Sequence, residues 1–179
     1  LYRLETLNNG RPLNETRAQL SRLPDFFRYF AGLAIARRDD VIPVEGSYLN
    51  YTLRTPIGVV ANCTPFNHPL MIMCKSLAAV LASGCTTVVK PSEYTPLTTL
   101  KLAEIFVEAG LPRGVFNVVL GYGPEAGRFL AEHPDINKIT FTGSTATGKR
   151  IMEGASKDLK RITLELGGND ASIVLPDAD

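Results

Sequence analysis

From residue 57 onward, short apolar runs rich in β-branched residues alternate with segments of helical pattern, and this alternation constrains the fold more than any other feature. The predicted strands span residues 57–61, 86–89, 115–120, 138–142, 161–164 and 171–175. The predicted helices between them span residues 68–83, 96–109, 124–132 and 145–156, and several begin at a proline or a small hydroxyl residue. Strands that alternate with helices of this length predict an α/β fold with a parallel, doubly wound sheet that helices cover on both faces.

The first 55 residues follow a different pattern. Asn14 is predicted to cap a helix whose apolar positions recur at helical spacing, and Pro24 is expected to break that helix or begin a new first turn. Residues 43–55 alternate loosely and predict a short pair of strands. We therefore expect a helical segment over residues 1–42 that packs on the sheet domain, a hairpin over 43–55 and an α/β domain over 56–179.

Composition and charge exclude two classes of partner. The 19 Lys and Arg residues nearly cancel the 18 Asp and Glu residues, so no basic surface for nucleic acid is expected. The longest apolar stretch, residues 70–82, contains Lys75 and Ser76 and is shorter than the roughly 20 residues that cross a bilayer. No charged-then-apolar leader follows Leu1, so we expect a cytoplasmic protein whose true start precedes this residue.

The cysteines and histidines predict no metal site. The three cysteines, Cys63, Cys74 and Cys85, form no CxxC pair, and the chain has only two histidines. An odd number of cysteines in a chain with no secretory leader is typical of reduced thiols. We interpret all three as structural.

Ligands in an open parallel sheet bind at the carboxyl ends of the strands, so the loops that follow the predicted strands carry the candidate site. Segment 143–149, GSTATGK, has the glycine and lysine spacing of a P-loop nucleotide-binding protein. Arg150 stands where a P-loop has Ser or Thr, which favours a plain phosphate-binding helix start at Gly143–Ser144. Segment 121–127 is one residue longer than the dinucleotide fingerprint GxGxxG, and a glycine-rich turn before a surface helix explains it equally well.

Three further positions carry polar side chains at predicted strand ends. Lys90 and Glu93 follow the strand over 86–89, where they either contact ribose and phosphate oxygens or form a solvated strand end. Asn67 follows the first strand, and its amide either caps the next helix or donates an N–H to a developing oxyanion. Glu165 precedes a turn with two glycines and is either a general base or a solvent-facing carboxylate.

Taken together and in this order, five segments resemble the signatures of the aldehyde dehydrogenase superfamily. They are Pro65-Phe-Asn67, Lys90-Pro-Ser-Glu93, Gly123-Pro-Glu-Ala-Gly127, Phe141-Thr-Gly-Ser144 and Glu165-Leu-Gly-Gly168. Each motif is weak alone, and the specificity comes from the set. The resemblance runs from Leu1, near which LETLNNGRP over residues 4–12 is also similar, to Asp179.

The resemblance implies a fold and a reaction. The fold is a Rossmann-like cofactor domain, here incomplete, with a catalytic domain absent from this chain and a small oligomerisation domain to which residues 43–55 contribute. In the reaction, a cysteine thiolate attacks an aldehyde, the thiohemiacetal passes hydride to NAD(P)+, and water hydrolyses the thioester to a carboxylic acid. The family nucleophile lies beyond Glu165, so we expect this chain to be inactive alone and its full-length parent to be a homo-oligomer, a dimer or tetramer. A non-catalytic relative that keeps the dinucleotide pocket is the alternative.

The resemblance also implies roles for single residues. Asn67 is similar to the side-chain oxyanion donor, and Glu165 to the base that activates the deacylating water. The expected cofactor contacts are Thr64, Pro65, Phe66, Lys90, Ser92, Glu93, Gly123, Gly127, Phe141, Gly143, Ser144, Thr147 and Leu166. We expect NAD as the cofactor, because Glu93 would repel the 2′-phosphate of NADP, although use of NADP stays open.

Overall fold

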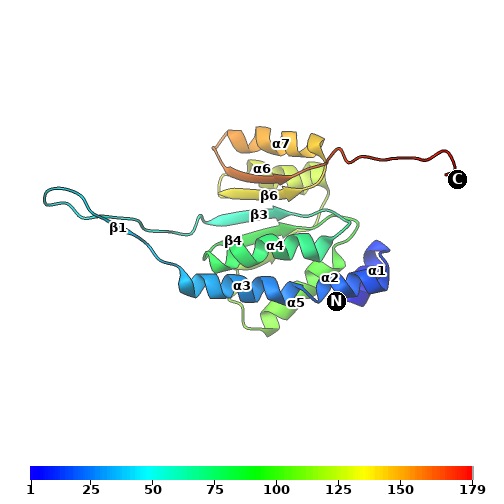
Figure 1. Cartoon of the computed structure of the whole chain (residues 1–179), viewed down its shortest axis with the longest axis horizontal. Helices are drawn as coiled ribbons and strands as arrows, with labels where there is room; N and C mark the ends of the chain where they lie inside the picture. Colours follow the sequence, from blue (N-terminus) through cyan, green and yellow to red (C-terminus); the bar gives the residue numbers. More distant parts are fainter. Residues whose placement is uncertain (179) are drawn as a thin grey trace.

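A five-stranded parallel sheet with strand order β5-β4-β3-β6-β7 forms the centre of the chain (Figure 1). The computed structural model describes residues 1–178. The strands are β3 (Val59–Cys63), β4 (Thr86–Lys90), β5 (Phe116–Val118), β6 (Lys138–Thr142) and β7 (Arg161–Glu165). Every neighbouring pair is parallel, which confirms the predicted α/β class.

Helices cover both faces of this sheet, as the alternation predicts (Figure 1). One face carries α4 (Pro69–Ala82) and α5 (Leu97–Glu108), and α3 (Leu23–Ala36) packs on the outer side of α4. The other face carries α6 (Arg128–Glu132) and α7 (Thr145–Ser156). The sheet is therefore doubly wound.

The side chains of β3 show how both faces become buried. Val60 packs with Val80 of α4, whereas Ala61 packs with Leu130 of α6 and Ile151 of α7. Successive strand residues point to opposite faces, so an almost continuous apolar run is what a strand between two helical layers requires. The buried strand Val59–Cys63 accordingly lies at the middle of the sheet.

Strand β3 begins two residues later than the sequence predicts. Gly58 has a φ of 122°, which lies outside the extended region and delays regular pairing until Val59. The side-chain oxygen of Asn137 accepts a hydrogen bond from the backbone N–H of Val59 at 2.8 Å and starts the strand. The strand ends at Cys63 rather than Ala61, because it stays paired with Lys90 of β4 and Phe141 of β6, and Thr64 follows directly at the edge of the sheet.

The N-terminal region contains α1 (Tyr2–Asn9) and α2 (Leu13–Leu20) before α3. Pro24 lies in the first turn of α3, which confirms the predicted new start. The predicted capping role of Asn14 is wrong, because α2 begins at Leu13 after Pro12 and makes no side-chain capping bond. Sequence periodicity did not predict α1, whose only buried residue is the charged Glu5 and whose position depends on packing against α2 and α5.

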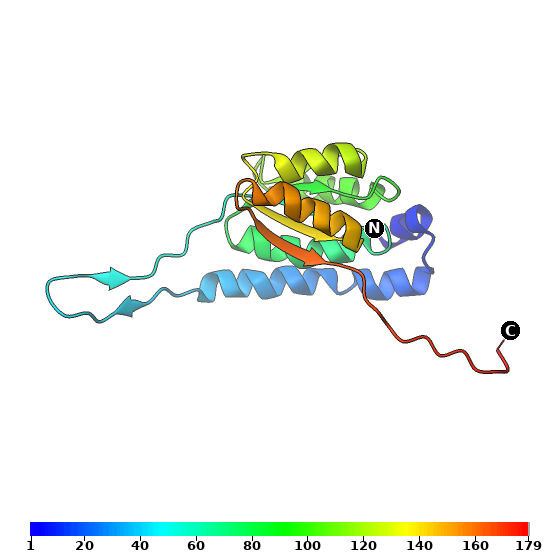
Figure 2. The same ribbon diagram turned by 90° about the horizontal axis from the view of Figure 1, so that it is seen from above.

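Two segments extend away from the sheet (Figure 2). The antiparallel pair β1 (Val41–Ile42) and β2 (Asn50–Tyr51) forms the predicted hairpin, although it begins two residues before residue 43. The predicted strand over residues 171–175 is wrong, because residues 166–178 are exposed and contain no strand. A strand needs a neighbour to accept its backbone hydrogen bonds, and within residues 1–178 no strand pairs with this segment.

Candidate active site

The candidate site lies at the carboxyl edge of the sheet, where the strand order changes direction. From β3 the chain continues to β4 and β5 on one side, then crosses to β6 and β7 on the other. The parallel register places Cys63 opposite Lys90 and Phe141, and Phe141 opposite Leu164. The predicted site segments 64–67, 91–93, 142–144 and 165–166 therefore all leave the sheet at one level. A topological switch point of this kind is where open α/β sheets bind ligands.

The first site loop, between β3 and α4, begins with a buried residue and ends with exposed ones. Thr64 is buried, and its backbone N–H donates to the carbonyl of Lys90 at 3.1 Å. Phe66 is 60% exposed, so its ring is available to a ligand. Pro65 between them is half-buried. The loop therefore presents an aromatic wall anchored by a backbone bond to β4.

The side chain of Asn67 is oriented by its neighbour. Its Oδ1 atom accepts a hydrogen bond from the backbone N–H of His68 at 3.0 Å. The residue that caps α4 is His68, so Asn67 does not occupy the capping position. Within residues 1–178 the amide N–H groups of Asn67 make no hydrogen bond, and the residue is exposed. Of the two interpretations that the sequence left open, this geometry favours an N–H donor to a ligand.

Lys90 and Glu93 form a partly buried ion pair at the end of β4. The Nζ atom of Lys90 lies 3.4 Å from a carboxylate oxygen of Glu93 and donates to the carbonyl of Pro91 at 3.0 Å. The side chain of Lys90 is only 6% exposed, and that of Glu93 is 32% exposed. Ser92 between them is buried as well. A solvated strand end would expose Lys90 and Ser92, and both are buried. Of the ion pair, only the carboxylate of Glu93 is partly exposed to solvent.

The glycine-rich segment after β5 winds into a wide turn. Residues Gly123–Gly127 form a single π-helical turn, η1, that leads directly into α6. A π-turn holds one residue more than an α-turn, which accounts for the interval that exceeds the dinucleotide fingerprint. A side chain added at Gly123 would meet no atom within 4 Å, and one added at Gly127 would lie 3.8 Å from Cδ of Lys90. The turn thus forms an open cradle beside Lys90.

The loop between β6 and α7 presents a helix N-terminus. Ser144 caps α7, because its Oγ atom accepts from the backbone N–H of Thr147 at 3.2 Å. The first N–H groups of α7 have no partner within the helix, and the helix dipole adds positive potential there. Gly143 donates its backbone N–H to the carbonyl of Glu165 at 3.0 Å, and the ring of Phe141 occupies the space over Gly143. This end of α7 is suited to bind a phosphate.

Glu165 and Leu166 close the site at the edge strand β7. Glu165 is the last residue of β7 and is exposed. Leu166 packs so closely on α7 that a side chain at Gly148 would come within 2.6 Å of its Cδ2 atom. Only β6 separates β3 from β7, so the backbone at the two strand ends lies about 10 Å apart. The loop that carries Asn67 and the end of β7 that carries Glu165 therefore leave the same edge of the sheet.

None of the three cysteines belongs to this site as a nucleophile. Burial raises the pKa of Cys63 to about 11 and that of Cys74 to about 12, so both thiols stay protonated at neutral pH. Cys85 is buried at the amino end of β4, the opposite edge of the sheet. Within the described residues 1–178, no group of His, Cys, Asp and Glu is suited to hold a metal ion. No described helix is long and apolar enough to span a membrane.

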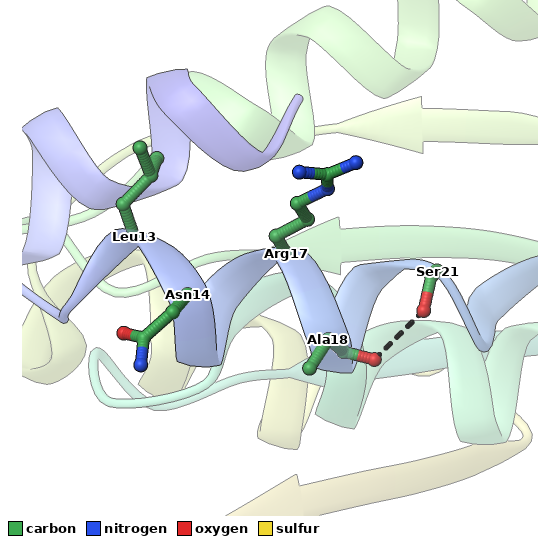
Figure 3. A pocket seen from close by; sticks show the side chains of 5 residues that line it. All are labelled: Leu13, Asn14, Arg17, Ala18 and Ser21. Carbon is green, nitrogen blue, oxygen red and sulfur yellow. Dashed lines mark hydrogen bonds between the residues drawn. The ribbon is translucent and has the colours of Figure 1, made fainter.

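Two surface hollows of the chain lie elsewhere. One, on α2, is lined by Leu13, Asn14, Arg17, Ala18 and Ser21 (Figure 3). The other, of about 690 Å³, lies beneath α6 and is lined mainly by apolar residues such as Val59, Val88 and Val119. None of the predicted site residues lines either hollow. Neither hollow therefore contributes to the site at the strand ends.

Sequence patterns missed the residues of the N-terminal region that reach the site. The side chain of Asn8 donates to the carbonyl of Tyr94 at 3.3 Å and accepts from the backbone N–H of Leu97 at 3.1 Å. The side chain of Asn9 donates to the carbonyl of Asn67 at 3.4 Å. The sequence signals for them are the polar run Asn-Asn-Gly-Arg at residues 8–11 and the resemblance of residues 4–12 to the family, neither of which assigns a contact.

Comparison with known proteins identifies the family. The sequence pattern of the aldehyde dehydrogenase family matches residues 1–179, the whole chain. The chain belongs to the aldehyde dehydrogenase family. It is 48% identical to the Bacillus subtilis (strain 168) protein DhaS over 180 residues, and 47% identical to an aldehyde dehydrogenase of Enchytraeus buchholzi over 186 residues. All of this chain is covered in each case, but only 36% of each relative, so the chain spans about a third of their length.

Solved structures of aldehyde dehydrogenases have the same fold. PnpE in complex with nicotinamide adenine dinucleotide is 53% identical, with a TM-score of 0.90 over 94% of this chain and 35% of that protein. Betaine aldehyde dehydrogenase of Staphylococcus aureus, also in complex with NAD+, is 40% identical, with a TM-score of 0.90 over 93% of this chain and 34% of that protein. The resemblance that the motifs indicate and the Rossmann-like fold of the chain are both confirmed.

Proposed function

We propose that this chain is the cofactor-binding part of an enzyme that oxidises an aldehyde to a carboxylic acid with NAD+. One observation carries this proposal: the exposed amide of Asn67, the Lys90–Glu93 pair and the free N-terminus of α7 meet at one sheet edge of an aldehyde dehydrogenase family member. These three features supply donors for an oxyanion, a ribose and a phosphate, respectively.

The residues present fit a dinucleotide. Gly143, Ser144 and Thr147 would hold the pyrophosphate at the N-terminus of α7, which is exposed at the sheet edge. Lys90 and Glu93 would hold the adenosine ribose beside the open cradle of Gly123–Gly127. The remaining predicted contacts, which would line the nicotinamide half, are Thr64, Pro65, Phe66, Phe141 and Leu166. When bound, NAD+ supplies the acceptor for a hydride.

Two side chains of this chain would act on the substrate. Asn67 would donate an N–H to the oxygen that becomes negatively charged as the aldehyde carbonyl is attacked. Glu165 would accept a proton from the water that releases the acid, which its exposed position at the end of β7 permits. The attacking thiolate would come from another part of the full-length protein, because burial keeps Cys63 and Cys74 protonated.

The Lys90–Glu93 pair supports NAD over NADP as the cofactor. The ion pair with a nearly buried lysine restrains Glu93, so its carboxylate cannot easily turn away from an added 2′-phosphate. In the neighbours crystallised with a cofactor, PnpE and the betaine aldehyde dehydrogenase, that cofactor is NAD+. Both observations favour NAD+ as the cofactor of this chain.

The hairpin β1–β2 supports the proposal that the full-length protein is a homo-oligomer. Its apolar side chains are exposed, including Tyr48 at 82% and Leu49 at 75%. A short exposed pair of strands offers an edge to which a second subunit can add. Replacing both residues by serine would convert the oligomer to monomers in size-exclusion chromatography, whereas an unchanged elution volume would contradict this assignment.

The full-length protein tests the proposed activity. We expect NADH to form from NAD+ with an aldehyde from a panel of aliphatic and aromatic compounds. The variant Asn67→Ala should lose about 100-fold in kcat, the usual loss for one oxyanion donor, with unchanged affinity for NAD+. Asn14→Ala, an exposed asparagine on α2, serves as the matched control and should keep full activity. Binding of NAD+ without turnover of any aldehyde would instead indicate a non-catalytic dinucleotide-binding protein.

A further inference from the structure

A cluster of polar side chains from the N-terminal region surrounds His68, the residue next to Asn67. The Nη1 atom of Arg11 lies 2.7 Å from Nδ1 of His68, and the side-chain amide nitrogen of Gln19 lies 2.8 Å from the same atom. Arg11 also donates to the side-chain oxygen of Gln19 at 2.6 Å. The side chain of Arg11 is only 19% exposed, so these bonds form in a partly buried setting.

The chemistry of arginine determines the state of His68. A guanidinium only donates hydrogen bonds, so Nδ1 of His68 must be the acceptor and the ring proton must lie on Nε2. Burial lowers the pKa of His68, and the positive charge of Arg11 lowers it further. Glu15 orients the guanidinium through a 3.2 Å ion pair and partly offsets this effect. The ring is therefore neutral, its Nδ1 atom accepts from Arg11, and the side-chain amide of Gln19 packs against the same atom, with its nitrogen at 2.8 Å and its oxygen at 3.0 Å.

The position of His68 controls the direction of the Asn67 amide. The backbone N–H of His68 donates to Oδ1 of Asn67, and the amide N–H groups of this exposed residue make no hydrogen bond within residues 1–178. The backbone carbonyl of Asn67 is held separately by the side chain of Asn9, two residues before Arg11. Figure 1 shows α1 at the same end of the sheet as the exit of the chain from β7. The segment Asn9–Gln19 thus contacts the site loop at both Asn67 and His68.

We propose that Arg11, acting with Gln19, is a positioning residue for the reaction: it holds His68 and thereby fixes the direction in which Asn67 donates its N–H. This inference rests on the proposed function, in which Asn67 binds the oxyanion. Displacement of a catalytic donor by about 1 Å can lower the reaction rate as much as 100-fold. An arginine that positions the donor can therefore control catalysis without touching the substrate. Arg11 contributes positioning, and Asn67 contributes the donor.

A double-mutant cycle in the full-length enzyme tests this role. We expect Arg11→Met to lower kcat about 10-fold and to leave the affinity for NAD+ unchanged, because the cofactor contacts lie on other loops. Arg11→Lys, which keeps a charged donor, should recover most of the loss. In an Asn67→Ala background, Arg11→Met should have almost no further effect on kcat. Equal losses in both backgrounds would show that Arg11 acts only on overall stability and would overturn the proposal.

Arg28→Met provides the matched control. Arg28 pairs with Asp25 on α3 at 3.0 Å, but both side chains are more than 70% exposed. This variant should leave kcat, the affinity for NAD+ and Tm unchanged. A loss of kcat equal to that of Arg11→Met would show that any arginine of the N-terminal region has this effect, which would overturn the specific role.

Hydrogen–deuterium exchange of the full-length protein gives a readout that does not depend on turnover. In Arg11→Met, the peptide that covers residues 64–69 should exchange faster than in the wild type, whereas a peptide from β6 should not change. Unchanged exchange over 64–69 would overturn the proposal. If the wild-type protein oxidises no aldehyde, the proposed function fails, and the exchange data still decide whether Arg11 holds the loop.

Discussion

The ammonium of Lys90 lies 3.4 Å from the carboxylate of Glu93, and only the carboxylate end of this pair reaches the surface. A lysine that is 6% exposed rarely occurs without a partner, so Glu93 is bound in place by the charge that it compensates. The fixed negative charge lies where we propose that the adenosine ribose binds. This relationship links the structure of β4 to the choice between two cofactors.

Replacing Glu93 by glutamine should relax cofactor choice. The variant removes the charge that repels a 2′-phosphate, and we expect the ratio of kcat/KM for NADP to that for NAD to rise about 10-fold, which corresponds to about 1.4 kcal/mol. Glu104→Gln is the matched control, because Glu104 also pairs with a lysine three residues away but is exposed on α5. An unchanged ratio in Glu93→Gln would remove the basis for NAD preference.

Replacing Glu165 by glutamine should separate the two halves of the reaction. If Glu165 only activates the deacylating water, the first turnover stays fast and steady-state kcat falls about 100-fold. Stopped-flow measurement should then show a burst of NADH that approaches one per active site. Glu153→Gln, an exposed carboxylate on α7, should behave like the wild type. A slow first turnover would instead place Glu165 in the attack step.

Replacing Cys63 by alanine should leave the reaction intact. Burial raises the pKa of this thiol to about 11, so almost none of it is thiolate at neutral pH, and the thiolate is the reactive form. We expect kcat within about twofold of the wild type and a loss of stability of about 1 kcal/mol from the small void. A 100-fold loss of kcat without unfolding would contradict the structural role of Cys63.

Glu5 should make stability depend on pH in an unusual direction. The carboxyl of Glu5 is fully buried, and neither of its oxygens has a hydrogen-bond partner. Burial raises its pKa, and the nearby Leu70 backbone and Thr98 side chain offset only part of this increase. A carboxyl with a raised folded-state pKa binds more protons when folded. Its contribution is therefore present below the ordinary pKa of glutamate and is lost as pH rises through the raised value.

The variant Glu5→Gln removes this dependence. At pH 8 we expect its Tm to exceed that of the wild type by about 2 °C, a shift typical of somewhat less than 1 kcal/mol. The difference should shrink as the pH falls through the raised pKa of Glu5 and the wild-type carboxyl regains its proton. Glu108→Gln, an exposed carboxylate on α5, provides the control. A lower Tm at pH 8 would show that the charge of Glu5 stabilises the fold.

Local pattern was sufficient for most of the fold, whereas the roles expected of the site residues come from the family resemblance and stay predictions. The alternation after residue 57 predicts the five observed strands within two residues or so at each end, because burial between helices requires nearly continuous apolar runs. The sixth predicted strand, at 171–175, does not form, because no described strand lies beside it to accept its backbone hydrogen bonds. Apolar and β-branched residues make a strand possible, but only a paired neighbour makes it form.

The sequence by itself determined that this chain forms a doubly wound α/β sheet and which residues meet at its carboxyl edge. These properties depend on the period of apolar residues and on the order of motifs, both of which can be read locally. Only the tertiary structure decided that Lys90 is buried against Glu93 and that Arg11 contacts His68. Arg11 and His68 are 57 residues apart in the chain, and no local pattern encodes a hydrogen bond between side chains that only the packing of α1 and α2 against the sheet domain brings together.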